Sequence, residues 1–460
     1  MKGFVPTPAD TVDLMVEKLM AGIADPRDMR VLDPGCGEGE FIDGLLRYCE
    51  SYGLSRPRIV GIELDPGRAA ISRKRFSRVK EVEIREADFL RPSTDTFDLI
   101  VGNPPYVSIL ELDASERSYF RQAYSSARGR FDLYVLFFEQ ALRMLATGGR
   151  LVFVTPEKYL YVESARGLRE LLLSRHVSEL HFAPESTFGS LVTYPLITTV
   201  SAESSLAPTS IKSRDGSELA VRIETAGSWL PAVTGSTPSE HRELVLKDVT
   251  LRVSCGVATG ADQVFVVRKS ELSPALSRFA HPTLSGRQIS PDRRVTNDHV
   301  ILAPYDGTGR LLPESSLGAL GAFLNDPDRR AQLERRTCAT RKNWFAYHDN
   351  LPLDVMLRPK LLCKDITETP FFIIDETGSI VPRHSVYYVV PVDPSDLRPL
   401  ASYLNSAEAQ DWMRSHCQRA AKGFLRMQSH TLKQLPIPAT VASSLKGVPS
   451  TSIQLEALPA

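Results

Sequence analysis

The chain has 460 residues, of which 42% are hydrophobic and 24% charged, and its formal net charge at pH 7 is zero. This composition is typical of a soluble globular protein, and the length exceeds one ordinary hydrophobic core, so we expect two domains. No stretch approaches the roughly eighteen apolar residues of a membrane span, and the N-terminus lacks the apolar core of a signal peptide. We therefore expect a cytoplasmic enzyme without a membrane partner.

The six cysteines show no C-x-x-C spacing and stand among apolar or small residues. We interpret them as reduced, buried thiols, and we predict neither a zinc site nor a disulfide framework. No metal requirement is expected for the chemistry. The six are Cys36, Cys49, Cys255, Cys338, Cys363 and Cys417.

The first predicted elements are a helix, a short buried strand and a glycine-rich loop. Thr7 and Pro8 precede apolar residues that recur mostly at helical spacing up to Met20, and a strand is predicted over 29–32. The loop 33–39 then reads Asp-Pro-Gly-Cys-Gly-Glu-Gly. Its glycines let a ligand lie against backbone N–H groups at a helix start. The G-x-G-x-G spacing differs from the dinucleotide fingerprint and argues against a nicotinamide cofactor.

The next two predicted strands, 59–62 and 82–85, each lead to an acidic residue. Glu63 could bind the two hydroxyls of a ribose, and Asp88 with Phe89 could bind the amino group and ring of an adenine. Either carboxylate alone is more often a solvated surface group, but the set at successive strand ends indicates a nucleoside site. Strands and helices alternating at this pace predict a doubly wound, mostly parallel, Rossmann-like sheet with its ligand at the carboxyl ends.

A fourth predicted strand, 97–101, leads to a stiff turn formed by Asn103, Pro104, Pro105 and Tyr106. The prolines fix φ and lack N–H groups. The Asn103 side-chain oxygen and the Pro104 carbonyl can then accept both hydrogens of one exocyclic amine, which favours a tetrahedral, nucleophilic nitrogen, while Tyr106 offers a stacking face. Alone, the four residues could equally be a simple turn after a strand.

A polar connector over 108–130 contains several arginines, including Arg128 and Arg130. It could close over a substrate and reach phosphates, or it could be a solvated loop. A helix over 132–145 and a strand over 151–154 follow. Further along, Phe188 could be a second aromatic slab opposite Tyr106, although a loop phenylalanine is usually part of a core.

The second part of the chain contains basic residues interleaved with aromatic ones, a pattern that suits phosphates and splayed bases. The alternative is a solvated basic helix that covers core aromatics. The DNA-binding candidates here are Arg335, Arg336, Arg341, Lys342 and Arg426.

With these motifs in this order, the chain resembles the bacterial DNA adenine-N6 methyltransferases of the gamma arrangement, from type II restriction-modification systems. The resemblance covers residues 1 to about 200 and is diffuse beyond. It implies an S-adenosylmethionine-binding catalytic domain over 1–235 and a mixed α+β DNA target-recognition domain over 236–460. It also implies catalytic roles for Asn103, Pro104, Pro105, Tyr106 and Phe188. The implied cofactor contacts are Thr7, Asp33, Gly35, Glu63, Asp88, Phe89 and Phe137.

The resulting hypothesis is site-specific methyl transfer from S-adenosylmethionine to N6 of an adenine flipped out of double-stranded DNA. The partner endonuclease of a restriction-modification system could be encoded separately, or the enzyme could act alone. One rival is N-methylation of RNA or of a protein glutamine, because glutamine methyltransferases also use Asn-Pro-Pro-Tyr; they lack the long basic extension. A second rival is a DNA-binding module with the methyltransferase fold as scaffold, which the intact motifs disfavour.

Overall fold

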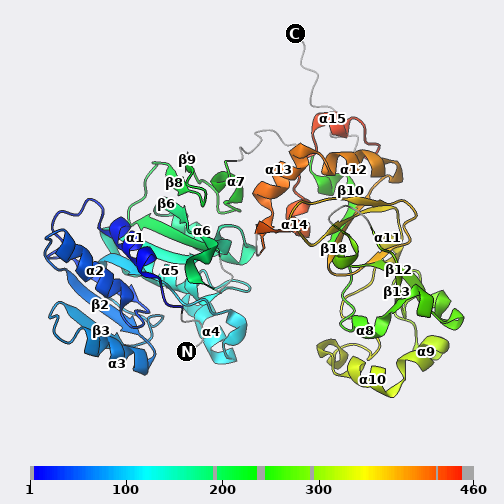
Figure 1. The fold of residues 1–460 in the computed structure, drawn as a ribbon, viewed down its shortest axis with the longest axis horizontal. Coiled ribbons are helices and arrows are strands. Elements are labelled where there is room, and N and C mark those ends of the chain that lie inside the picture. The colour runs from blue at the N-terminus through cyan, green and yellow to red at the C-terminus, as the bar shows by residue number, and fades with distance from the viewer. Residues whose placement is uncertain (1–4, 190–193, 236–243, 291–294, 421–422, 448–460) are drawn as a thin grey trace, which may run out of the picture. The chain divides into compact units, whose positions relative to one another are not determined.

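The structure is a computed structural model that describes residues 5–189, 194–235, 244–290, 295–420 and 423–447 (Figure 1). The chain divides into two compact units, residues 1–237 and 238–460, which we treat separately. Among the described residues, no helix is long and apolar enough to cross a membrane.

Unit 1, residues 1–237, is built on a nine-stranded sheet with the order β3-β2-β1-β4-β5-β7-β6-β8-β9. The first five strands pair in parallel, and β7 lies antiparallel between β5 and β6. This topology confirms the predicted mostly parallel, doubly wound sheet. Its strands are β1 (Arg30–Pro34), β2 (Arg58–Glu63), β3 (Val82–Glu86), β4 (Phe97–Gly102), β5 (Leu145–Pro156), β6 (His176–Phe182), β7 (Pro195–Ser201), β8 (Thr209–Lys212) and β9 (Glu218–Val221).

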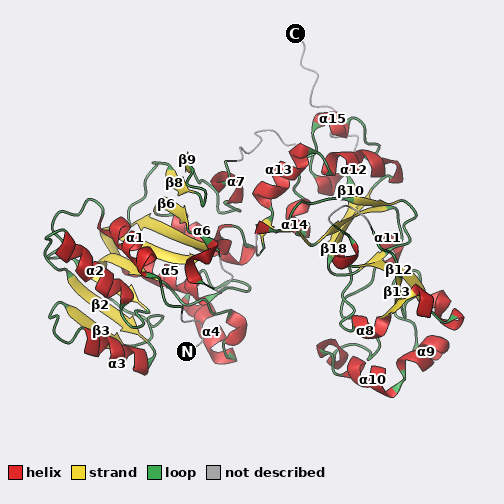
Figure 2. Cartoon of the chain, in the orientation of Figure 1, coloured by secondary structure: helices red, strands yellow, loops and turns green. Residues whose placement is uncertain are grey.

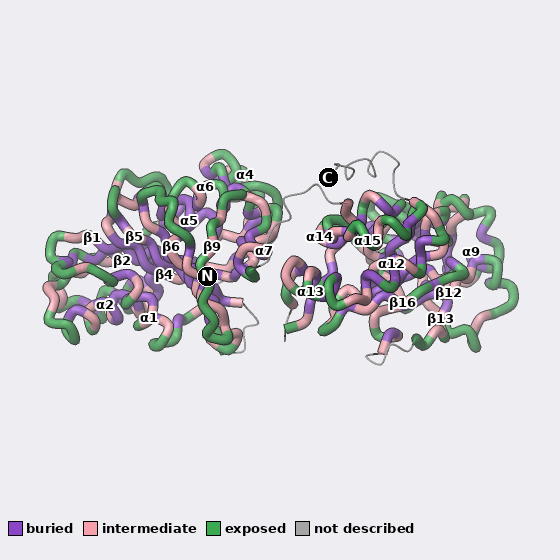
Figure 3. Tube along the Cα trace, turned by 90° about the horizontal axis from the view of Figure 1, so that it is seen from above, coloured by how far each residue is buried: buried purple, intermediate pink, exposed green. Residues whose placement is uncertain are grey.

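Helices cover both faces of this sheet, because the central strands are apolar on both sides. Leu99 and Val152 pack with the helices of one face, and the adjacent Ile100 and Phe153 pack with those of the other. The strands are accordingly buried between helices (Figure 3). One face carries α1 (Ala9–Met20), α2 (Glu40–Ser51) and α3 (Pro66–Arg75), and the other carries α4 (Ala114–Ala123), α5 (Leu133–Met144), α6 (Arg166–Leu173) and α7 (Leu230–Val233).

The glycine-rich loop joins β1 to α2 at the carboxyl edge of the sheet. Gly39 caps the helix with a φ of 91°, a conformation that side-chain-bearing residues rarely adopt. A Cβ at this position would lie 2.3 Å from a ring carbon of Phe76. The loop is also tied to the neighbouring strand, since the Gly35 and Cys36 amides both donate to the Ile62 carbonyl, at 2.7 and 2.9 Å. Its shape is therefore fixed before any ligand binds.

Unit 2, residues 238–460, mixes short helices with three small sheets, as the α+β prediction required (Figure 2). The sheets are β10-β18-β14-β16, β11-β13-β12-β17 and β15-β20-β19. Their strands are β10 (Thr250–Cys255), β11 (Val266–Arg268), β12 (Ala280–Leu284), β13 (His299–Leu302), β14 (Lys360–Lys364), β15 (Ile366–Thr367), β16 (Ile373–Asp375), β17 (Val381–Pro382), β18 (Val386–Pro391), β19 (Gln418–Arg419) and β20 (Leu425–Arg426). The helices are α8 (Asp262–Phe265), α9 (Ala319–Leu324), α10 (Pro327–Glu334), α11 (Leu353–Met356), α12 (Leu397–Leu404), α13 (Ala407–His416), α14 (Ser429–Leu432) and α15 (Ala439–Ala442).

Apolar spacing in unit 2 predicts one amphipathic helix over 400–414, but the structure divides this region into α12 and α13. The break is made by two polar side chains. Asn405 exchanges two hydrogen bonds with the Phe372 backbone, at 2.8 and 2.9 Å. Ser406 caps α13 by accepting from the Ala409 amide. Side-chain hydrogen bonds to the backbone thus compete successfully with helix continuation.

Candidate active site

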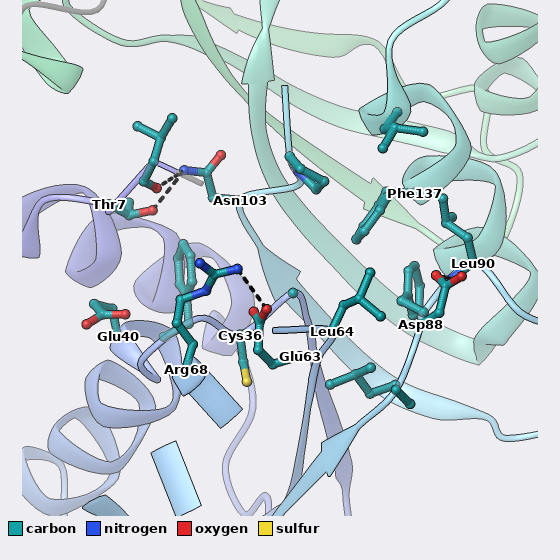
Figure 4. A pocket seen from close by; sticks show the side chains of 18 of the residues that line it. Thr7, Cys36, Glu40, Glu63, Leu64, Arg68, Asp88, Leu90, Asn103 and Phe137 are labelled. Atoms are coloured by element: carbon teal, nitrogen blue, oxygen red, sulfur yellow. Dashed lines mark hydrogen bonds and ion pairs between the residues drawn. The ribbon is translucent and has the colours of Figure 1, made fainter. Parts of the chain in front are cut away.

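A pocket opens at the carboxyl edge of the unit 1 sheet, where the loops after β1, β2, β3 and β4 converge (Figure 4). Six of the seven residues predicted to contact a cofactor line it, and so do Asn103 and Pro105 of the catalytic motif. The six are Thr7, Gly35, Glu63, Asp88, Phe89 and Phe137. Residues more than a hundred positions apart are brought together because parallel strands end at one edge.

Glu63 is the most strongly held carboxylate of the pocket. Its two oxygens accept hydrogen bonds from the Gly37 amide at 3.0 Å, the Asp65 amide at 2.7 Å and the Arg68 guanidinium at 3.0 Å. Figure 4 shows the Arg68 side chain reaching Glu63 inside the pocket. A carboxylate fixed in this way is ready to accept from ligand hydroxyls without reorganising.

Sequence patterns do not predict Arg68 as part of this site. It stands in the first turn of α3, and its amide donates to the cap residue Asp65 at 3.0 Å. Asp-Pro at residues 65–66 is a helix-start signal, and that signal could have indicated that residue 68 faces back toward the strand end. Arg68 and Glu40 both line the pocket.

An apolar slot lies on the far side of the pocket from Thr7. The rings of Phe89 and Phe137 stand with their centroids 5.0 Å apart. Beside them, Asp88 is held by the Leu90 amide and the Arg91 guanidinium, each at 3.0 Å. Apolar walls with one oriented carboxylate match a planar ring that bears an amino group.

Asp33 is the exception among the predicted cofactor contacts, because it lies behind the pocket wall. It is 1% exposed, and no described residue donates a hydrogen bond to either carboxylate oxygen. Burial, with Glu40 and Glu63 nearby, raises the pKa of Asp33 well above its usual value. A carboxylate in such a position is stabilised only by positive charge brought close to it.

Asn103 occupies the junction between this pocket and the catalytic turn. Its amide nitrogen donates two hydrogen bonds, to the Val5 carbonyl and to the Thr7 hydroxyl, both at 3.1 Å. Figure 4 shows both bonds as dashed lines between Asn103 and the N-terminal segment that contains Thr7. Because the nitrogen is fully engaged, the identity of the oxygen is fixed. That oxygen is buried and has no hydrogen-bond partner in the described structure.

Tyr106 stands next to Asn103 with its hydroxyl donating to the Val154 carbonyl at 3.4 Å. Its ring meets Phe188 edge to face, with centroids 6.4 Å apart and planes at 85°. The two rings therefore do not form the parallel sandwich expected from the sequence in this conformation.

The basic candidates of unit 1 lie on its surface. Arg128 and Arg130 are both exposed. The Arg128 guanidinium donates to the Ser125 carbonyl at 3.0 Å and contacts Glu170 at 3.4 Å. Exposed pairs of this kind are weak, so Arg128 remains able to bind a phosphate.

Among the candidates of unit 2, Arg336 stays a predicted DNA contact, but its half-buried guanidinium is already engaged within the protein. Its guanidinium donates to the carbonyls of Leu333, Thr259 and Trp344, at 3.0, 2.7 and 2.6 Å. It is thus a structural link between a helix end and two loops. The neighbouring aromatics Phe345 and Tyr347 are buried, which is the arrangement expected if basic residues cover core aromatics.

The remaining unit 2 candidates keep their charges at the surface. Arg335, Arg341, Lys342 and Arg426 are all exposed. Lys342 also donates to the His348 carbonyl at 2.7 Å, which limits its reach. The six cysteines are free thiols, five buried and Cys255 half-buried, and the described residues contain no cluster of metal-ligating side chains.

Comparison with known proteins assigns a class to this arrangement. Residues 59–188 match the Eco57I restriction-modification methylase family, and residues 281–437 match the TaqI-like C-terminal specificity domain. Among solved structures, the type IIL restriction-modification enzyme MmeI in complex with DNA has a similar fold, with a TM-score of 0.63 at 14% identity. That match covers 93% of this chain and 63% of the MmeI chain. The class is thus a methyltransferase fold combined with a specificity domain.

The relatives are more specific. Type II methyltransferase M.PaeR7I of Pseudomonas aeruginosa is 26% identical over 95% of this chain and 86% of its own length. Type II methyltransferase M.XhoI of Xanthomonas vasicola is 24% identical over 95% of this chain and 91% of its own. Residues 59–188 are therefore similar to a restriction-modification methylase and residues 281–437 to a specificity domain, and the relatives that match nearly the whole chain are type II methyltransferases. The resemblance stated from the sequence is confirmed.

The cofactor of this methylase domain is S-adenosylmethionine, and the pocket residues fit it. Glu63 is placed to accept from ribose hydroxyls, and the slot at Asp88, Phe89 and Phe137 suits an adenine ring.

Proposed function

We propose that this protein transfers a methyl group from S-adenosylmethionine to N6 of an adenine flipped out of double-stranded DNA. The observation that carries the proposal is the Asn103 amide, whose nitrogen is engaged by Val5 and Thr7 while its buried oxygen has no partner. Buried polar atoms are nearly always hydrogen-bonded, and one that is not calls for an explanation. Because the Asn103 oxygen lacks a donor and the residue lines the cofactor pocket, we infer that a hydrogen-bond donor of the substrate binds to this oxygen.

The second acceptor is the Pro104 carbonyl, to which no described residue donates a hydrogen bond. An exocyclic amine carries two hydrogens, so it can bond to the Asn103 oxygen and to this carbonyl together. Both bonds draw the amine away from planarity and localise its lone pair. The two oxygens also stabilise the positive charge that develops on nitrogen as the methyl group arrives.

When bound, S-adenosylmethionine supplies an electrophilic methyl group on a sulfonium. In the transfer, a carbon–nitrogen bond forms at N6 as the carbon–sulfur bond breaks, and one N6 proton is then lost to solvent. Within the protein, Asn103 and Pro104 hold the amine, and Glu63, Phe89 and Phe137 hold the cofactor. No covalent intermediate with a protein side chain is required.

Tyr106 provides a face on which an extrahelical base can stack. Flipping a base out of a duplex costs a few kcal/mol, and stacking on an aromatic ring recovers about 1 to 3 kcal/mol per base. The Phe188 ring stands edge-on to Tyr106, so we infer that it turns when the base enters. The exposed Arg128, Arg130, Arg335, Arg341 and Arg426 are the candidates for contacts to DNA.

The test is a methyl-transfer assay with radiolabelled S-adenosylmethionine and plasmid DNA, RNA and protein extract side by side. We expect label in DNA only, and N6-methyladenine as the modified nucleoside after digestion. Label in RNA or in a protein glutamine would support the rival N-methyltransferase instead. A specific DNA footprint without any transfer would support the scaffold reading.

Because the relatives belong to restriction-modification systems, we also propose a partner for this protein. The partner would be a separately encoded endonuclease that cuts the same sequence. Methylated DNA should then resist the cognate nuclease while unmethylated DNA is cut. Expression of this protein from a plasmid, followed by digestion of that plasmid with a candidate endonuclease, measures this protection.

A further inference from the structure

One edge of the largest sheet in unit 2 gathers the ends of three strands. Cys255, the last residue of β10, and Cys363 of β14 both stand opposite Tyr387 of β18, and Lys364 stands opposite Val386. Since β18 is antiparallel to both neighbours, β10 and β14 end where β18 begins. Asp365 follows directly, between β14 of this sheet and β15 of the small β15-β20-β19 sheet.

The backbone of Asp365 is clamped at this switch between sheets. Its amide donates to the Ser385 carbonyl at 3.0 Å, and its carbonyl accepts from the Met427 amide at 2.7 Å. The next residue, Ile366, pairs with Arg426 on β20. These bonds fix the Asp365 backbone, and its carboxylate lies near enough to the charged groups of Arg426 and His384 to interact with them.

The Asp365 carboxylate is half-buried, yet it accepts no hydrogen bond and forms no ion pair with any described residue. Arg426 and His384 are exposed, and their side chains likewise have no described partner. Burial raises the pKa of Asp365, while Arg426 and His384 act to lower it. By contrast, the neighbouring Arg383 has partners within the protein. Its guanidinium donates to Asp262 at 3.2 Å and to Gln288 at 2.9 Å.

A half-buried carboxylate that lacks a donor lies next to an arginine that lacks an acceptor. Together they complement the major-groove edge of one kind of base pair. In the major groove a C·G pair presents the cytosine N4 amine beside the guanine O6 and N7 acceptors. Carboxylates accept from that amine, and arginine donates to guanine O6 and N7.

We propose that Asp365 and Arg426 together read one C·G base pair of the DNA target, with Asp365 accepting from cytosine N4 and Arg426 donating to guanine. The proposal rests on the proposed DNA methylation and adds to it two specificity-determining residues. Arg426 thereby changes from a general candidate for DNA contact to a base-reading residue.

The experiment compares the full-length wild type with Asp365→Asn and Arg426→Gln. Each protein methylates a plasmid library with a randomised target, and sequencing of modified adenines gives the preference at every position. We expect each variant to lose roughly ten-fold or more of its discrimination at one shared C·G position, with the other positions unchanged. Glu368→Gln, an exposed acid three residues away, is the matched control and should keep the wild-type preference.

Folding is checked separately, by thermal unfolding. The Asp365→Asn protein should unfold at the same or a higher temperature at pH 7, because the substitution removes a charge that burial disfavours. If Asp365→Asn proves unstable, Asp365→Ser takes its place in the assay.

Unchanged preference at every position in folded Asp365 variants would overturn the inference while leaving DNA methylation intact. For Arg426→Gln, a uniform loss of affinity at all sequences with a smaller salt slope would mark a phosphate contact and contradict base reading. If the wild type modifies RNA or protein and no DNA, the proposed function fails and this inference fails with it.

Discussion

Asn103 in unit 1 and Arg336 in unit 2 are both polar side chains that donate to backbone carbonyls. Arg336 is half-buried and donates to three of them, which takes up most of its N–H groups. The Asn103 nitrogen also donates to a carbonyl, but its oxygen is left open beside the pocket. The comparison teaches that the bonding capacity left over after folding, more than residue type or spacing, distinguishes a functional group from a structural one.

The largest effect on cofactor binding should come from Glu63. It accepts three hydrogen bonds from the protein, and ligand hydroxyls should donate to it as well. Glu63→Gln removes the charge that strengthens these bonds, worth about 1.5 to 3 kcal/mol for a hydrogen bond to a charged group. We expect the dissociation constant for S-adenosylmethionine to rise roughly ten- to a hundred-fold. Calorimetric titration of the full chain measures it, and an unchanged constant would remove Glu63 from the cofactor site.

Arg336 tests the other half of the comparison. Arg336→Ala should lower the free energy of unfolding by about 2 to 3 kcal/mol, because three hydrogen bonds from a charged donor to part-buried carbonyls are lost. Its neighbour Arg335 is exposed, so Arg335→Ala should leave stability unchanged and weaken DNA binding with a salt slope smaller by about one. Denaturant unfolding and DNA-binding assays at several salt concentrations distinguish the two variants. Equal losses of stability in both would contradict the structural role assigned to Arg336.

Much of unit 1 could be predicted from sequence because strong local signals agree there. The apolar run 97–101 predicts a buried strand, and β4 confirms it. The spacing of Arg335 and Arg336 could not reveal which guanidinium turns inward, since that depends on carbonyls of residues 259 and 344. Likewise, the break at Asn405 depends on the distant Phe372 backbone.

A smaller effect is expected at Thr7, which fixes the Asn103 amide from outside the catalytic turn. Thr7→Val removes one of two acceptors, and we expect kcat to fall about ten-fold, in line with the loss of one hydrogen bond. Thr7→Ser keeps the hydroxyl and should stay near wild-type activity. Steady-state methylation kinetics give both values. Equal activity of the valine and serine variants would show that the hydroxyl does not position Asn103.

The smallest effect concerns Asp33, whose pKa is raised by burial. The unfolded chain then releases this proton at lower pH than the folded one, so Asp33 lowers stability progressively as pH rises above about 4. Asp33→Asn should therefore unfold at a higher temperature than wild type at pH 7, with the gap closing toward pH 4. Thermal scans across this range test it, and a gap that widens toward acid pH would contradict the assigned direction.

The central claim is that the open Asn103 oxygen activates the substrate amine. Its most direct test is Asn103→Ala, measured for both methyl transfer and S-adenosylmethionine binding. We predict a loss of transfer of roughly 10²- to 10³-fold, with cofactor affinity within a few-fold of wild type. Wild-type turnover by a folded Asn103→Ala protein would contradict the account.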